Sequence, residues 1–274
     1  MRSLWLTGFA SALLLSCLGA AGCSADGVDR DDDLVATEEP LTSVTTAERT
    51  AAARQDLTGF TYEHLTPTST SIMRASRWWM DAQDESPRYP KARMCASNVS
   101  KVLFLAGLTT IDQEGVRALI GDVRDRGGSV YRMPQNPIEF ATTLATIDGG
   151  RVPAGTIVAG MNVNTSAPGD QHIGFVGHQD PDGTVWLYHN NWYRPENEAG
   201  QRKAFMVSEE NLRRGFPRQW MATPWIKVER DGYGAITRVS SLLPAIDDMD
   251  PFNPSFRVTL AILPQVAREL RSTR

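Results

Sequence analysis

The sequence predicts an α+β fold in which helices precede an antiparallel sheet. Between residues 68 and 108 the apolar side chains recur at helical spacing, whereas from residue 156 onward they alternate with a period of two. The strands that this alternation predicts follow one another through short connections, which is typical of an antiparallel sheet. The chain has 274 residues, of which 41% are hydrophobic and 22% are charged, so it can form a large core.

The predicted elements run along the chain as helices, then strands, then a short final helix. The helix that begins at Cys95 is apolar on more than one face, which predicts a buried central helix, and Gly107 is a natural stop. Pro224 marks an edge or a bulge in its strand. We expect helices at residues 68–84, 95–106, 111–126, 137–147 and 264–270, and strands at residues 130–133, 156–161, 172–177, 184–190, 203–207 and 220–228.

The first 22 residues are predicted to be a lipoprotein signal peptide. Arg2 precedes a short apolar run over residues 4–15, and small residues then lead to Cys23. Such a run is too short to cross a bilayer as a stable helix. Residues 20–23 resemble the lipobox of bacterial lipoproteins, which implies that Cys23 carries the lipid. Cys17 is a competing lipid site, and an ordinary cleaved signal peptide is the third alternative.

Residues 23–50 are predicted to be an acidic, disordered tether. Seven acidic residues and one arginine lie between residues 24 and 40, with few large apolar side chains among them. Because the formal net charge of the whole chain is -4, the rest of the chain is close to neutral, and nothing predicts binding to nucleic acid. We expect a catalytic domain over residues 51–235 and a C-terminal extension without a clear pattern over residues 236–274.

Cys95 stands in the first turn of the predicted central helix. Unpaired backbone N–H groups and the positive end of the helix dipole favour a thiolate there. If Cys17 leaves with the signal peptide and Cys23 carries the lipid, Cys95 is the sole thiol of the mature protein. It then cannot form an intramolecular disulfide, and catalysis is one reason for such a cysteine in an exported protein. A buried structural cysteine is the alternative.

A catalytic cysteine needs a base within hydrogen-bonding reach and a third group that orients this base. The chain has four histidines. His172 opens a predicted strand after a loop rich in Gly, Asn, Ser and Pro, which suits a side chain that faces a cleft. His64 and His178 fit the commoner role of a surface or packed residue.

Four segments resemble the NlpC-type and CHAP peptidoglycan hydrolases, which are bacterial relatives of papain. The helix that follows Cys95 reads Val-Ser-x-Val-Leu-x-x-x-Gly, like the cysteine helix of these enzymes. Residues 152–158 are similar to their Pro-Gly-Asp motif, with Thr156 where Asp is usual. His172-Ile-Gly-Phe-Val is similar to their His-Val-Gly-Ile-Val motif, and residues 182–192 resemble the CHAP pattern of Asp-Gly, a strand and Glu-x-Asn. Together these segments span residues 95–192.

The resemblance implies a papain-like core, in which the central cysteine-bearing helix packs on an antiparallel β-sheet after N-terminal helices. It also implies roles for four side chains and no cofactor. Cys95 falls on the nucleophile, His172 on the base, and Asn191 on the polar residue that orients the base. His189 falls where CHAP domains usually have a glutamate, so either the triad is Cys-His-Asn or catalysis is weakened. Zinc held by Cys95, His172 and His189 is an alternative that lacks closely spaced ligand pairs.

The resemblance and the signal peptide together predict a monomeric, lipid-anchored cysteine amidohydrolase of the bacterial cell envelope. Its expected substrates are peptidoglycan peptides, and its anchor is expected in a membrane. Ser24 rather than Asp after Cys23 favours the periplasmic side of the outer membrane, by resemblance to lipoprotein sorting signals. A cysteine protease or acyltransferase with a protein substrate is one alternative, because fold analogy does not choose the substrate. A non-catalytic envelope protein that uses the same scaffold for binding is the other.

Overall fold

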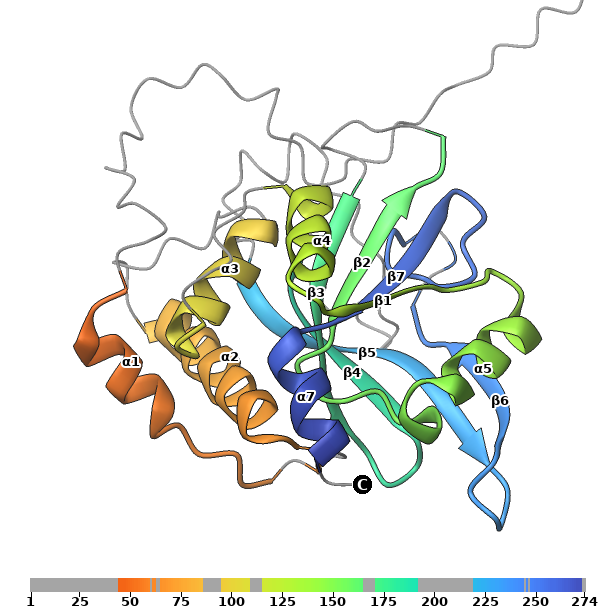
Figure 1. The fold of residues 1–274 in the computed structure, drawn as a ribbon, viewed down its shortest axis with the longest axis horizontal. Helices are drawn as coiled ribbons and strands as arrows, with labels where there is room; N and C mark the ends of the chain where they lie inside the picture. Colours follow the sequence, from red (N-terminus) through yellow and green to blue (C-terminus); the bar gives the residue numbers. More distant parts are fainter. Residues whose placement is uncertain are drawn as a thin grey trace, which may run out of the picture.

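The computed structural model describes residues 44–59, 61–62, 65–85, 95–108, 115–164, 171–191, 219–243, 245 and 247–272 (Figure 1). Several predicted features lie outside these residues. They are the signal peptide with Cys17 and Cys23, most of the acidic tether, His64, and the strand expected at residues 203–207.

The fold is α+β, as predicted. The described strands form one seven-stranded sheet with the order β1-β7-β2-β3-β4-β5-β6, and every neighbouring pair is antiparallel. The five predicted strands that fall on described residues each shift by no more than two residues at either end. The strands are β1 (Ser129–Arg132), β2 (Ile157–Asn162), β3 (Gln171–Gln179), β4 (Thr184–Asn191), β5 (Gln219–Arg230), β6 (Ile236–Ser241) and β7 (Phe256–Ile262).

The predicted helices are also present. Helix α4 begins at Val116 in the described chain, and residues 109–114, where its start was expected, are outside the described ranges. The helical elements are α1 (Thr46–Ala53), α2 (Pro67–Glu85), α3 (Cys95–Leu105), α4 (Val116–Asp125), α5 (Pro137–Thr146), the 3₁₀ turn η1 (Asp148–Gly150) and α7 (Pro264–Ser272).

Helix α1 corrects the predicted end of the tether. The tether was expected to extend to residue 50, but the helix begins at Thr46. A capping box explains its start: the Thr45 hydroxyl accepts from the backbone N–H of Glu48, and the Glu48 carboxylate accepts from the backbone N–H of Thr45. Residues 46–50 therefore belong to the fold, where α1 packs beside α2 (Figure 1).

Helix α3 is buried on every side, as its sequence predicts. All of its residues are buried, including the polar Asn98 and Lys101. Trp79 of α2 donates its Nε1–H to Asn98 Oδ1 at 2.8 Å, and the Lys101 ammonium lies 5.6 Å from the centroid of the same indole ring. The helix ends at Leu105, and Gly107 two residues later has a φ of 84°, which allows Leu108 N–H to bond to the Leu103 carbonyl.

The C-terminal region is an integral part of the sheet. Residues 236–274 were expected to form an extension, but they supply β6, β7 and α7. Strand β7 lies between β1 and β2 and pairs with both. Its residues alternate between apolar and polar from Phe256 to Leu260, and all seven except Arg257 are buried. Helix α7 buries one face, which includes Val266 and Ala267.

Strand register divides the side chains of the sheet between two faces. Phe175 and Tyr188 are paired and share one face, which α2 covers together with Tyr62. His172 and Gly160 are paired and share the opposite face. Residues 247–253 cross that second face. At Gly160, the backbone carbonyl of Asp248 lies where a side chain would otherwise be. The same segment is held where Trp225 donates its Nε1–H to the Met249 carbonyl at 2.9 Å.

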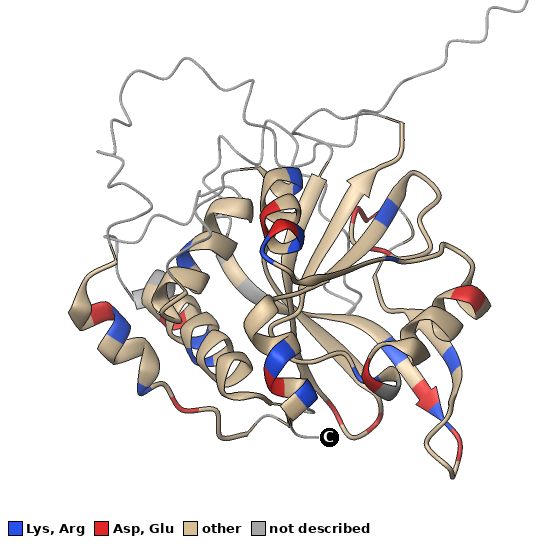
Figure 2. Ribbon diagram, viewed as in Figure 1, with Lys and Arg blue, Asp and Glu red and all other residues tan. Residues whose placement is uncertain are grey.

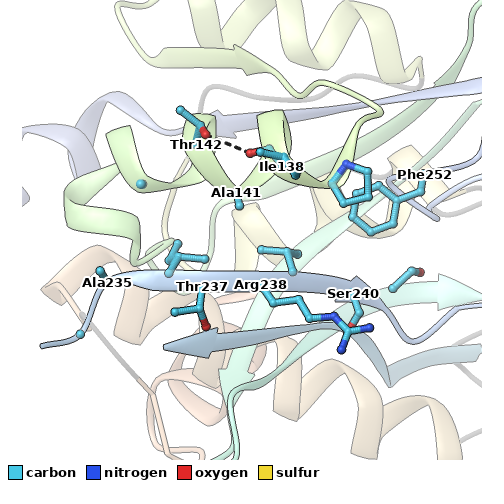
Figure 3. A pocket seen from close by; sticks show the side chains of 14 residues that line it. Ile138, Ala141, Thr142, Ala235, Thr237, Arg238, Ser240 and Phe252 are labelled. Carbon is cyan, nitrogen blue, oxygen red and sulfur yellow. Dashed lines mark hydrogen bonds between the residues drawn. The ribbon is translucent and has the colours of Figure 1, made fainter. Parts of the chain in front are cut away.

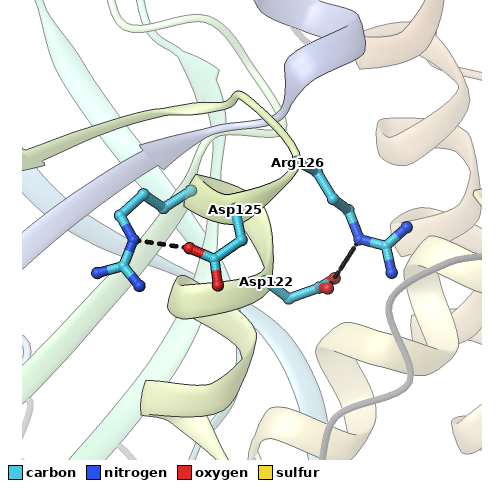
Figure 4. A network of polar contacts seen from close by, with 4 residues as sticks. Asp122, Asp125 and Arg126 are labelled. Carbon is cyan, nitrogen blue, oxygen red and sulfur yellow. Dashed lines mark hydrogen bonds and ion pairs between the residues drawn. The ribbon is translucent and has the colours of Figure 1, made fainter.

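Charged side chains avoid the centre of the sheet. Strands β2, β3 and β4 contain no Lys, Arg, Asp or Glu, and the charged residues of the described chain lie mainly on helices, turns and outer strands (Figure 2). On α4, Arg126 pairs with Asp122 at 2.7 Å and Arg124 with Asp125 at 2.9 Å (Figure 4). Such exposed pairs contribute about 0–1 kcal/mol each.

Among the described helices, none combines the length and apolarity needed to cross a membrane.

Candidate active site

Cys95 is the first residue of α3 and meets the sheet at the beginning of β3. Only 2% of its surface is exposed. Its Sγ atom lies 4.0 Å from the backbone carbonyl oxygen of Gln171, the residue directly before His172. The thiol and the candidate base therefore come from distant parts of the sequence to the same end of one strand.

His172 and His189 form a buried pair on the sheet. Their exposed fractions are 1% and 0%, and the Nε2 atom of His172 lies 3.0 Å from the Nδ1 atom of His189. The two rings are nearly perpendicular, at 71°. Gly174 makes this contact possible, because a Cβ atom there would lie only 2.6 Å from the Cβ atom of His189. The glycine of the His-Ile-Gly motif thus has a direct packing role.

Thr223 extends this pair to a third strand. Its Oγ1 atom lies 2.9 Å from the Nε2 atom of His189, and the side chain is buried. The three side chains come from β3, β4 and β5, which are neighbours in the sheet. A line of hydrogen-bonding atoms therefore runs from His172 through His189 to Thr223.

The ring nitrogens used in this line determine what the site can do. His172 uses Nε2 toward His189, so Nδ1 is the nitrogen that would act on a thiol. A neutral imidazole has one N–H donor and one acceptor nitrogen. His189 can accept from His172 Nε2–H only when its own proton is on Nε2, from which it donates to Thr223. Among the described residues, the line consists of two imidazoles and one hydroxyl.

Two further positions of the resembled motifs are Asn191 and Thr156. Asn191 is the last residue of β4, two positions beyond His189, and its backbone pairs with Gln219. Thr156, which stands where the resembled family has Asp, is buried, and its carbonyl accepts from the Val176 N–H at 2.8 Å. Cys23, the expected lipid site, is outside the described residues.

His178 is a packed residue, as expected. Its ring stacks on Trp186 with centroids 5.0 Å apart, and its Nδ1 atom lies 3.1 Å from the Tyr188 hydroxyl. Burial lowers the pKa of His178 to about 4, so its neutral form dominates at neutral pH. It belongs to the face of the sheet opposite His172.

A groove of about 630 Å³ lies between α5 and β6 (Figure 3). Its lining is mostly apolar, with Ile138, Ala141 and Phe252 on one side and Arg238 as its one charged residue. It includes neither Cys95 nor the two histidines, so we place no chemistry there. Within the described ranges, no group of three or more His, Cys, Asp or Glu side chains could hold a metal ion.

Sequence reasoning missed Thr223. It lies in a predicted strand, but its contact with His189 depends on the register between β4 and β5, which shifts near Pro224. Nothing in the local sequence marks this threonine.

No family model, curated protein or solved structure matches the chain.

Proposed function

We propose that the protein is a cysteine amidohydrolase of the bacterial cell envelope that cleaves amide bonds in peptidoglycan peptides. One observation carries the proposal. A cysteine at the start of a buried helix lies against the residue before His172, and His172 is in turn held by His189. These are the parts that nucleophilic catalysis by cysteine requires, namely a nucleophile, a base and a group that orients the base.

The reaction follows from these positions. Nδ1 of His172 takes the proton of the Cys95 thiol, and the thiolate attacks the carbonyl carbon of the substrate amide. The backbone N–H of Cys95, at the N-terminus of α3, stabilises the oxyanion. His172 then protonates the nitrogen that leaves as an amine. Water activated by His172 hydrolyses the thioester, which releases a carboxylic acid and restores the thiol.

His189 is proposed as the residue that orients His172, in preference to Asn191. The 3.0 Å contact between the two imidazoles supports this choice. A neutral histidine supplies no negative charge, so the imidazolium form of His172 is stabilised by hydrogen bonding and by the thiolate. Such a triad orients the base in the manner of Cys-His-Asn enzymes.

The substrate class rests on the motifs and on the predicted export. Four segments resemble cell-wall hydrolases with a papain-like core, and the signal peptide with Cys23 predicts a lipid-anchored protein near peptidoglycan. A cysteine protease or acyltransferase with a protein substrate would use the same residues. The transferase differs in that an amine or alcohol, rather than water, resolves the thioester.

The test is incubation of the full-length protein with purified muropeptides, followed by mass spectrometry. We expect products in which one amide bond has gained one water molecule. Intact muropeptides together with an acyl group on Cys95 from a peptide or protein donor would support the alternative substrate instead. Intact muropeptides and no acylation of Cys95 by any of these donors would contradict catalysis and leave the binding scaffold.

A further inference from the structure

The line of hydrogen bonds continues from His189 to the hydroxyl of Thr223. We propose that Thr223 is a positioning residue that selects the tautomer of His189 and, through it, the orientation of His172. The effect on catalysis rests on the proposed function, whereas the effect on the tautomer of His189 does not.

The Thr223 hydroxyl lies where it can accept from Nε2–H of His189. The Thr223 Oγ1 atom is 2.9 Å from Nε2 of His189, on the ring edge opposite to the contact with His172. All three side chains are at least nine-tenths buried, so water does not compete for these contacts. Thr223 is β-branched and sits in a paired strand opposite Leu187, which restricts its rotamers.

Each protonation state used in the proposed reaction needs the same tautomer of His189. To receive the thiol proton, His172 must keep a lone pair on Nδ1 and therefore carry its proton on Nε2. As an imidazolium it carries protons on both nitrogens. In either state Nε2–H points at Nδ1 of His189, which must accept, and the proton of His189 is then on Nε2. Thr223 is the acceptor for that proton.

The opposite tautomer would disable the site. With its proton on Nδ1, His189 would place an N–H against the Nε2–H of His172 at 3.0 Å, which is repulsive. His172 would lose its orienting partner. Removal of the Thr223 hydroxyl leaves the buried Nε2–H of His189 without its acceptor, and a lost buried hydrogen bond of this kind corresponds to about 10- to 100-fold in rate.

The tautomer can be measured directly. The full-length protein would be labelled with ¹⁵N in its four histidines, and the ring nitrogens of His189 assigned through a His189→Asn variant. We expect a protonated Nε2 and an unprotonated Nδ1 in the parent protein. Thr223→Val should shift the population of His189 toward protonated Nδ1, and Thr223→Ser, which keeps the hydroxyl, should restore the parent spectrum.

Thr259→Val is the matched control for a buried hydroxyl. Thr259 is buried in β7, and within the described residues its Oγ1 atom has no hydrogen-bond partner. Its replacement should leave the His189 nitrogens unchanged. A parent protein in which His189 is protonated on Nδ1, or a Thr223→Val variant with an unchanged tautomer, would overturn the proposal.

Activity provides the second measurement. In Thr223→Val we expect kcat/KM to fall about 10- to 100-fold, with Thr223→Ser close to the parent. A shifted tautomer with undiminished activity would overturn the positioning role. If the tautomer shifts but the parent protein itself has no activity and an unreactive Cys95, the proposed function fails, while the selection of the tautomer by Thr223 stands.

Discussion

Replacing Cys95 by alanine is expected to lower kcat/KM for amide hydrolysis by at least about 10⁴-fold, because no other group in the proposed site can form the thioester. His172→Ala should have an effect of similar size, since the thiol then lacks its base. The double variant should be no worse than either single variant, because the two residues act as one unit. Muropeptide hydrolysis followed by mass spectrometry measures all three.

His178→Asn is the matched control for loss of a buried imidazole. Its ring packs on Trp186 on the other face of the sheet, and asparagine can keep the contact with the Tyr188 hydroxyl. This variant should retain hydrolysis. Unchanged hydrolysis in Cys95→Ala, or a loss of hydrolysis in His178→Asn equal to that in His172→Ala, would contradict the assignment of the site.

Gly160→Ala is expected to destabilise the fold by about 1–3 kcal/mol, the usual cost of overpacking a full core. The added methyl group would collide with the backbone carbonyl of Asp248, and the Met249 sulfur would be 3.2 Å away. Backbone cannot rotate aside as a flexible side chain does. Urea unfolding monitored by tryptophan fluorescence would show the loss as a lower midpoint at constant slope.

Gly121→Ala is expected to stabilise the protein, whereas Gly160→Ala destabilises it. Gly121 lies inside α4, and nothing stands within 4 Å of its missing side chain. Alanine should stabilise the helix there by about 0.5–1 kcal/mol. If Gly160→Ala were as harmless as Gly121→Ala, residues 247–253 would not be packed against the sheet beside His172.

The elements that follow a single clear rule were predictable from the sequence. Helix α3 combines apolar residues on more than one face with a glycine stop, and the structure buries it and ends it at Leu105, two residues before Gly107. The Asp-Pro-Asp-Gly turn between β3 and β4 closes through a bond from Gly183 N–H to the Asp180 carbonyl. In both places local conformation and burial favour the same structure, so local patterns suffice.

Features that depend on contacts distant in sequence were not predictable. The position of strand β7 between β1 and β2 could not be derived, because its partners begin about 130 and 100 residues earlier in the chain and local sequence does not specify such pairing. Thr223 contributes through strand register, and β4 and β5 are joined by a long intervening segment. The motifs predicted His172 and left His189 and Asn191 as alternative partners. We propose His189 because its ring lies 3.0 Å from that of His172. Gly174 leaves room for the His189 side chain beside it.

The pH dependence of Cys95 alkylation by iodoacetamide tests the central claim most directly. The full-length protein and its His172→Ala variant would be compared, with modification of Cys95 followed by peptide mapping, because Cys17 and Cys23 can also react. A thiolate paired with His172 should react well below about pH 7, and this reactivity should disappear in the variant. Reaction only near the pKa of an ordinary thiol, about 8.5, with no dependence on His172, would contradict catalysis by Cys95.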